Sequence, residues 1–127
     1  MANEITYSAR ISVSKGNLQL TYAPSALQPD LSADTGSAGQ QVIGDVAEAV
    51  TIGTDTLTGG MAFFRNLSTA ATITLSKATN TTSFDPLIRL LPGEYVVCRL
   101  QTTNVWAQAA TVTGATAATL QYHILSA

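Results

Sequence analysis

The feature that most constrains the fold of this chain is an alternation of apolar and polar residues. In residues 4–14, EITYSARISVS, apolar side chains take every second position. Neighbouring side chains of a strand point to opposite faces, so this spacing predicts a strand with one buried face. That face would carry Ile5, Tyr7, Ala9, Ile11 and Val13. Helical spacing is almost absent, and only DVAEAV at 45–50 is rich enough in Ala and Glu to favour a helical turn instead.

Similar short segments recur along the chain and predict an all-β protein. Residues 4–14 and 18–22 flank Lys15-Gly16-Asn17, a sequence that tolerates positive φ, and should form a hairpin. The further expected strands are 41–44 with 46–52 (a short pair, or one strand bent at Gly44), 61–67, 71–76, 84–91, 95–100, 104–110 and 119–125. About 8–10 short strands at this spacing are typical of an antiparallel β-sandwich or barrel.

Residues 23–40, APSALQPDLSADTGSAGQ, interrupt the alternation and predict a long loop. Loops of this length in compact domains are usually functional or mobile, so this loop is a candidate interaction arm. The N-terminal strand is a second candidate, because an extended segment can add to the exposed edge of a sheet. No linker divides the chain, and its 127 residues favour a single β-sandwich domain over 1–127.

The charge content excludes several classes of partner. Only 11% of the residues are charged and the net charge is -2, whereas a typical soluble domain has about 25% charged residues. Nucleic-acid binding needs clustered Lys and Arg to neutralise phosphates, and this chain has no such cluster. The N-terminus lacks the basic and apolar regions of a signal peptide, and no apolar run reaches the ~18 residues of a membrane span. We therefore expect no nucleic-acid and no membrane partner, and synthesis in a reducing host cytoplasm, which suits a chain with one cysteine.

The sequence contains no recognisable chemical site. His123 is the only histidine and lies on an expected strand, where an outward position is the simplest interpretation. One Cys and one His cannot make a zinc site, and the acidic residues are not spaced like a calcium-binding loop. No serine-nucleophile or phosphate-binding motif occurs. Cys98 has the surroundings of a small apolar strand residue, which is usually buried and inert. We expect no enzyme, no catalytic residue and no cofactor or metal.

Two adjacent phenylalanines mark the first stretch with candidate interaction residues, GGMAFFRNLSTAATITLSKA at 59–78. Phe63 and Phe64 point to opposite faces, so one enters the core and the other needs cover from a loop, the first strand or another subunit. Asn66 begins the segment Asn-Leu-Ser-Thr, where its side chain can hold a turn by bonding to the backbone. The alternative is that Arg65 and Asn66 contact a ligand.

The second stretch, LIRLLPGEYVVCRL, joins two expected strands through Pro92-Gly93 and brings Arg89, Glu94 and Arg99 near one another. An exposed Glu–Arg pair contributes only about 0–1 kcal/mol but can set the strand register. The sequence leaves open which arginine Glu94 meets.

The remaining candidate is Trp106, the only tryptophan. It could form an aromatic platform for a glycan with Tyr22, Tyr95 and Tyr122, although core packing of these rings is the simpler interpretation.

A family resemblance rests on the order of these segments: the turn SKGN, the Pro/Ser/Gly loop, MAFFRNLS, FDPLIRLLPGEYVVCRL and the closing LQYHIL. Its sharpest parts are 64–67 and 90–94 with Arg99-Leu100. In this order the chain resembles the small β-sandwich virion proteins of tailed bacteriophages, several of which are capsid decoration (cement) proteins with a jelly-roll fold.

The resemblance implies a non-enzymatic structural subunit at the capsid surface of the virion. Its partners would be the major capsid protein and further copies of itself, with a trimer favoured, and it would stabilise the phage head by non-covalent contacts. A surface rich in hydroxyl groups agrees with this role, because such groups are cheaper to desolvate than charges. The alternative is a receptor- or glycan-binding module of a phage tail, fibre or spike.

Overall fold

A computed structural model describes residues 4–30, 36–52, 60–77, 80–102, 104–111 and 117–126. Within these ranges the chain is all-β and contains no helix. Its contacts divide it into two units, the first made mainly of residues 1–33 and the second of residues 34–126. The two units are described separately below, and the expectation of one domain over 1–127 stays a prediction.

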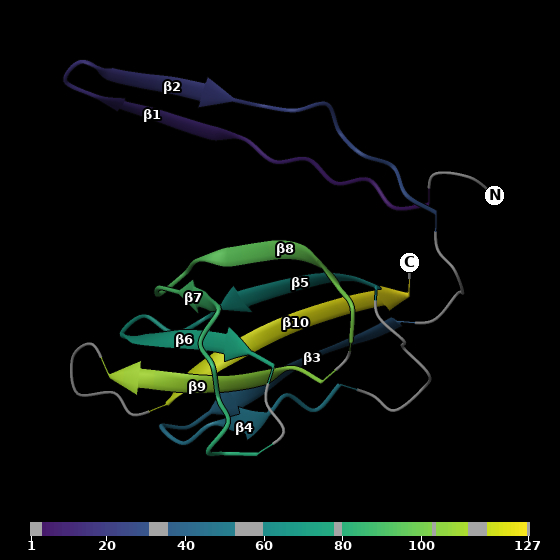
Figure 1. Ribbon diagram of the computed structural model, residues 1–127, viewed down its shortest axis with the longest axis vertical. Helices are drawn as coiled ribbons and strands as arrows, with labels where there is room; N and C mark the ends of the chain where they lie inside the picture. The colour runs from purple at the N-terminus through teal and green to yellow at the C-terminus, as the bar shows by residue number, and fades with distance from the viewer. Residues whose placement is uncertain are drawn as a thin grey trace. The chain divides into compact units, whose positions relative to one another are not determined.

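The second unit is an antiparallel β-sandwich of eight strands, as predicted (Figure 1). The first sheet has the order β3-β10-β5-β8 and consists of Gly36–Ile43, Ala118–Ser126, Gly60–Asn66 and Tyr95–Leu100. The second sheet has the order β4-β9-β6-β7 and consists of Glu48–Ala49, Trp106–Thr111, Ala71–Ser76 and Ile88–Leu90. Every pairing within the two sheets is antiparallel.

The strand order is that of a jelly roll. From β3 to β10 the chain changes sheet at every connection except the one between β6 and β7, which are neighbours in the second sheet. Strands far apart in sequence are therefore paired, such as β3 with β10. This arrangement matches the eight-stranded double sheet of jelly-roll proteins, so the predicted jelly-roll-like sandwich is confirmed.

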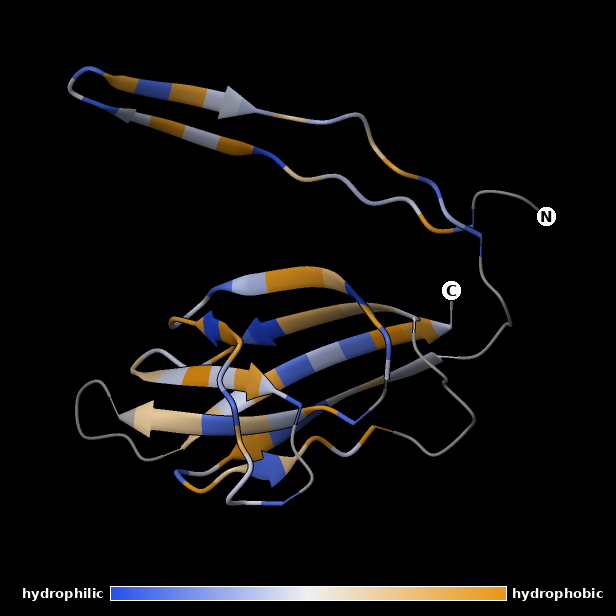
Figure 2. Cartoon of the chain, in the orientation of Figure 1, coloured by the Kyte–Doolittle hydropathy of each residue, from blue (hydrophilic) through white to orange (hydrophobic). Residues whose placement is uncertain are grey.

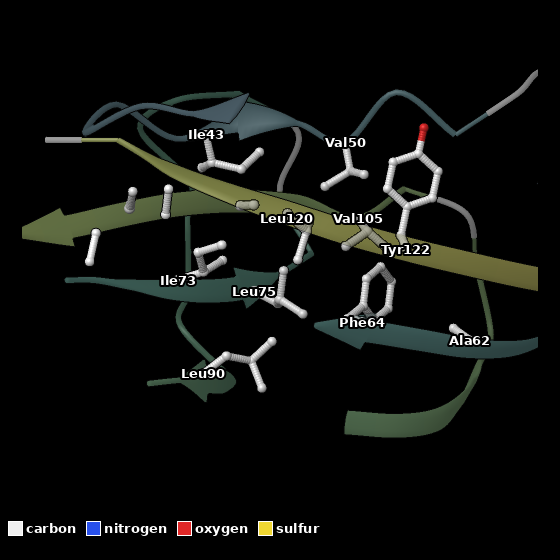
Figure 3. Packing of buried hydrophobic residues seen from close by; sticks show 14 of the residues in the cluster. Ile43, Val50, Ala62, Phe64, Ile73, Leu75, Leu90, Val105, Leu120 and Tyr122 are labelled. Carbon is white, nitrogen blue, oxygen red and sulfur yellow. The ribbon is translucent and has the colours of Figure 1, made fainter. Parts of the chain in front are cut away.

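The core lies between the two sheets and is filled by alternate residues of both (Figure 3). In β10, Leu120, Tyr122 and Ile124 are buried on one face, as the alternation predicted. Phe64 of β5 lies directly opposite Tyr122 and is also buried. Ile73 and Leu75 of β6 cover the core from the second sheet.

Side chains hold the first change of sheet, between β3 and β4. The Glu48 carboxylate accepts hydrogen bonds from the Gly44 amide (2.8 Å) and from the Gln41 side chain (3.3 Å). The Gln41 amide group also donates to the Ala49 carbonyl (3.0 Å) and accepts from the Thr51 amide (2.8 Å). These bonds stabilise a break at Gly44 rather than a helical turn. The two strands on either side of the break lie in different sheets, so they do not form the expected pair.

Three sequence-based assignments within the sandwich are wrong. Of residues 46–52, expected in a strand, only Glu48–Ala49 form β4. Residues 36–40, expected in a loop, belong to β3, because pairing with β10 outweighs the weak strand propensity of Gly and Ser. Residues 84–87, expected in a strand, are irregular and only 88–90 form β7. In that segment the carbonyl of Asp85 accepts a hydrogen bond from the Ser76 hydroxyl, and the Leu87 amide donates to the Leu75 carbonyl (3.1 Å).

The first unit is a two-stranded hairpin, as predicted. Strands β1 (Ile11–Lys15) and β2 (Leu18–Tyr22) pair antiparallel around a tight turn in which Gly16 has a φ of 56°. Beyond the ladder the two segments stay paired at Tyr7 with Leu27 and through the Ile5 amide and the Pro29 carbonyl (3.2 Å). We call residues 5–29 the hairpin arm.

The prediction that the first strand buries its apolar face holds only at its start, where Ile5 is buried and Tyr7 is half-buried, and is wrong for the rest. Ile11 is 64% exposed, Ala9 is exposed and Val13 is only half-buried. On the second strand, Leu18, Leu20 and Tyr22 are exposed too. Alternation determines which side chains share a face, but it does not determine whether another layer covers that face.

Candidate interaction surface

The described residues contain no group of His, Cys, Asp and Glu side chains placed to hold a metal ion. His123 is exposed on the outside of the first sheet, as expected, and lies beside the ring of Phe63. Among the acidic residues, Asp34 and Asp55 lie outside the described ranges. The described part of the chain also has no helix long and apolar enough to cross a membrane.

A cavity of about 300 Å³ lies at the edge of the sandwich between β7 and β8. Its walls are mainly apolar and include Phe64, Leu75, Ile88, Cys98 and Leu100. Both β7 and β8 are edge strands, so each has a hydrogen-bonded neighbour on one side only. The cavity therefore lies where the open edges of the two sheets come together. Cys98 lines it as a half-buried apolar residue, in agreement with its expected role.

The position of Cys98 leads to a testable prediction about its reactivity. Burial raises the pKa of the Cys98 thiol above 9.0, because the thiolate is poorly solvated there. At pH 8 the folded protein should therefore react with an aromatic disulfide reagent more slowly than the same protein in denaturant. The difference should shrink as the pH rises through the raised pKa. Equal rates at pH 8 with and without denaturant would contradict this assignment.

The outward side of the first sheet forms a candidate interaction surface of the sandwich, and we call it the aromatic face. The register of the strands places its members in rows across the sheet. They are Ala38, Gln40 and Val42 of β3, Thr119, Gln121, His123 and Leu125 of β10, Met61, Phe63 and Arg65 of β5, and Tyr95, Val97 and Arg99 of β8. Met61 is buried and so does not add to the exposed part of this face.

Three rings lie together on the aromatic face. Phe63 stacks on Tyr95, with 5.7 Å between ring centroids, and meets His123 edge-on at 6.0 Å. Phe63 is thereby half-buried, so its cover comes at least in part from these two rings. Tyr95 remains 66% exposed, and Val97, which lies opposite Phe63, is 44% exposed. Contiguous exposed apolar side chains of this kind mark protein–protein contact sites.

The candidate residues predicted from the sequence lie in different parts of the structure. Arg65 and Arg99 are both exposed on the aromatic face, where Arg65 lies opposite Tyr95 and Arg99 opposite Met61. Asn66 is fully buried at the end of β5. It does not contact a ligand together with Arg65, because the two side chains point to opposite sides of the strand.

Asn66 instead holds three segments of backbone. Its side-chain oxygen accepts a hydrogen bond from the Ser68 amide (2.9 Å), which is the expected Asx turn. Its amide nitrogen donates to the carbonyls of Ala71 (2.8 Å) and Leu90 (3.0 Å). The structure therefore shows Asn66 holding a turn, which was the simpler of the two interpretations of the sequence. It adds two hydrogen bonds that the sequence did not predict.

The remaining candidates lie apart from the aromatic face. Glu94 accepts a hydrogen bond from the Leu91 amide (2.8 Å) and so closes the Pro92-Gly93 turn, where Gly93 has a φ of 81°. Arg89 is exposed on β7 and pairs in register with Thr74 on the second sheet. Arg89 and Arg99 are thus on strands of different sheets, and the contact observed for the Glu94 carboxylate is to the backbone of its own turn.

The four aromatic residues considered as a glycan platform do not share one surface. Tyr122 is buried and its hydroxyl donates to the Thr51 carbonyl (2.6 Å). Trp106 is half-buried on the second sheet and its indole N–H donates to Asn104 (3.0 Å). Tyr22 belongs to the hairpin arm, and Tyr95 is the only one of the four on the aromatic face.

Sequence reasoning missed the aromatic face because its residues come from four strands. Tyr95, Phe63 and His123 are far apart in sequence and meet only through the register of β8, β5 and β10. The available signal was the Phe63-Phe64 pair, because neighbouring strand residues point to opposite faces and one of the two rings had to lie outside the core. Comparison with protein-family models, with curated proteins and with solved structures finds no match for this chain.

Proposed function

We propose that this protein is a structural virion protein that decorates a phage capsid. In this role it stabilises the head by non-covalent contacts with the major capsid protein and with neighbouring copies of itself. The resemblance described above suggests the class of particle, and it favours a trimer. The protein would be made in the host cytoplasm and act at the capsid surface without catalysing a reaction.

The observation that carries this proposal is the exposed aromatic face on a jelly-roll sandwich. Tyr95, Val97, Val42 and Leu125 together present apolar side chains at 40% exposure or more. Arg65 and Arg99 add cationic groups among these apolar side chains. A broad contact of this composition suits a protein lattice, because interface cores are rich in aromatic residues and arginine.

Binding to expanded capsids tests this function. We expect the double substitution Tyr95→Ser and Val97→Ser to weaken capsid binding at least tenfold, since central aromatic contacts dominate interface energies. Arg89→Ser is the control, because Arg89 is equally exposed but lies on the second sheet. The measurements are sedimentation with purified capsids and the temperature at which the decorated capsids open. Capsids that keep their composition and heat resistance without this protein would refute the proposal.

The glycan-binding alternative has less support from these residues. Tyr95 and Phe63 stack on each other, so neither ring offers both faces to a sugar. Saturable binding on a glycan array that is lost in Tyr95→Ala, with the fold intact, would favour the alternative over capsid decoration.

A further inference from the structure

The hairpin arm has one apolar face and one polar face. Opposed residues of an antiparallel pair share a face, so Ile11 with Tyr22, Val13 with Leu20, and Lys15 with Leu18 lie on one side. We call these six side chains the apolar stripe. The other side carries Ser12, Ser14, Gln19 and Thr21, of which Ser12 and Thr21 are bonded through their hydroxyls (3.2 Å). Figure 2 shows the same alternation of hydrophobic and hydrophilic residues along both strands.

The apolar stripe is so exposed that the hairpin by itself would have little stability in water. Its four largest apolar side chains are 53% to 64% exposed. A single two-stranded hairpin is marginally stable in water, and independent stability needs a third strand or packing on a further layer. A stable arm therefore requires a cover for the stripe.

We propose that the cover is the apolar stripe of a second copy of this chain, with the two hairpin arms stacked face to face. This proposal deepens the proposed function, since it names the surface through which neighbouring copies contact one another, and it rests on that function only for the existence of copy-to-copy contacts. Two-stranded ribbons can stack at the ~10 Å spacing of packed sheets.

The area of the stripe fits a pairing between copies. With roughly 200 Å² for each large side chain, the exposed fractions give about 500 Å² per arm and about 1,000 Å² for a pair. That total is near the lower limit for a specific interface. Because the same patch meets itself, the contact is isologous and closes without leaving a free stripe.

The charges agree with this pairing. Within the ladder the only charged residue is Lys15, which lies at the turn end of the stripe. Its long side chain can lie along apolar surface while the ammonium group stays in water. Stacking two stripes therefore brings apolar side chains together without burying an unpaired charge.

The test measures the mass of the full-length protein in solution, without capsids, by sedimentation over a range of concentrations. We expect a self-associating wild type, and a dissociation constant raised at least tenfold by Leu20→Ser with Tyr22→Ser. The matched control is Gln19→Ser with Thr21→Ser, which changes the same strand on its polar face and should leave the constant within about threefold. Fluorescence of Trp106, which lies in β9 of the sandwich, reports whether each variant keeps the sandwich fold.

Each outcome decides the proposal. Dissociation of a wild-type dimer by the stripe variant alone supports it, because an isologous contact between two stripes closes at two copies. A trimer overturns it, because face-to-face pairing would leave one of three stripes uncovered. A monomeric wild type at all concentrations overturns it, as does an oligomer that the stripe variant leaves intact. A monomer that still binds capsids would overturn this inference while leaving the proposed function standing.

Discussion

Replacing Asn66 by alanine should lower the free energy of unfolding by about 3–5 kcal/mol, because it removes two buried hydrogen bonds and a partly buried one at once. The side chain of Asn66 is fully buried and bonds to the backbone of Ser68, Ala71 and Leu90. Without it, two carbonyls and one amide lose this partner in the interior. Since small domains are stable by only about 5–15 kcal/mol, the loss is a large part of the total.

Asn80 offers a matched control for this prediction. Its side-chain oxygen also closes an Asx turn, accepting bonds from the amides of Thr82 and Ser83 (both 2.9 Å), but it is exposed. Water can replace these bonds, so Asn80→Ala should cost about 1 kcal/mol or less. Urea unfolding followed by Trp106 fluorescence measures both variants. Similar unfolding midpoints for the two variants would mean that burial of Asn66 does not determine how much its side chain contributes to the free energy of unfolding.

The comparison of the two asparagines explains how much of the candidate site the sequence could predict. The Asx turn at Asn66 is local, because the residues that bond lie within two positions of each other. The bonds to Ala71 and Leu90 depend on how β6 and the end of β7 approach β5, and no local pattern reports that. Local turn chemistry was therefore predictable, whereas the role of Asn66 as a junction between both sheets was not.

The same division between local and long-range information applies to the fold. Alternation identified β6 and β8 at the residues where they are observed, because each has side chains suited to a pleated surface. It failed at 36–40, where Gly and Ser enter a strand only because β10 pairs with them. It also failed for β1 and β2 of the hairpin arm, whose alternation is regular although no buried face results there.

The adjacent phenylalanines give the second prediction with a large expected effect. Phe64→Ala should destabilise the sandwich by about 3–5 kcal/mol, because the ring is 1% exposed and its removal leaves a hole in the core. Phe64 also lines the cavity between β7 and β8, so the truncation would enlarge that cavity. The neighbouring strands are held by their ladders and cannot easily collapse into that space.

Phe63→Ala is the control, since it removes the same ring from the next position of the same strand. Phe63 is half-buried on the aromatic face and contacts Tyr95 and His123, so its loss should cost only about 1–2 kcal/mol. If the aromatic face binds the capsid, the order of the two variants reverses in a binding assay. Folded Phe63→Ala protein should bind capsids more weakly than folded Phe64→Ala protein at a temperature where both are native. If urea unfolding gave equal losses of unfolding free energy for the two variants, the difference in burial between Phe63 and Phe64 would not determine their contributions to stability.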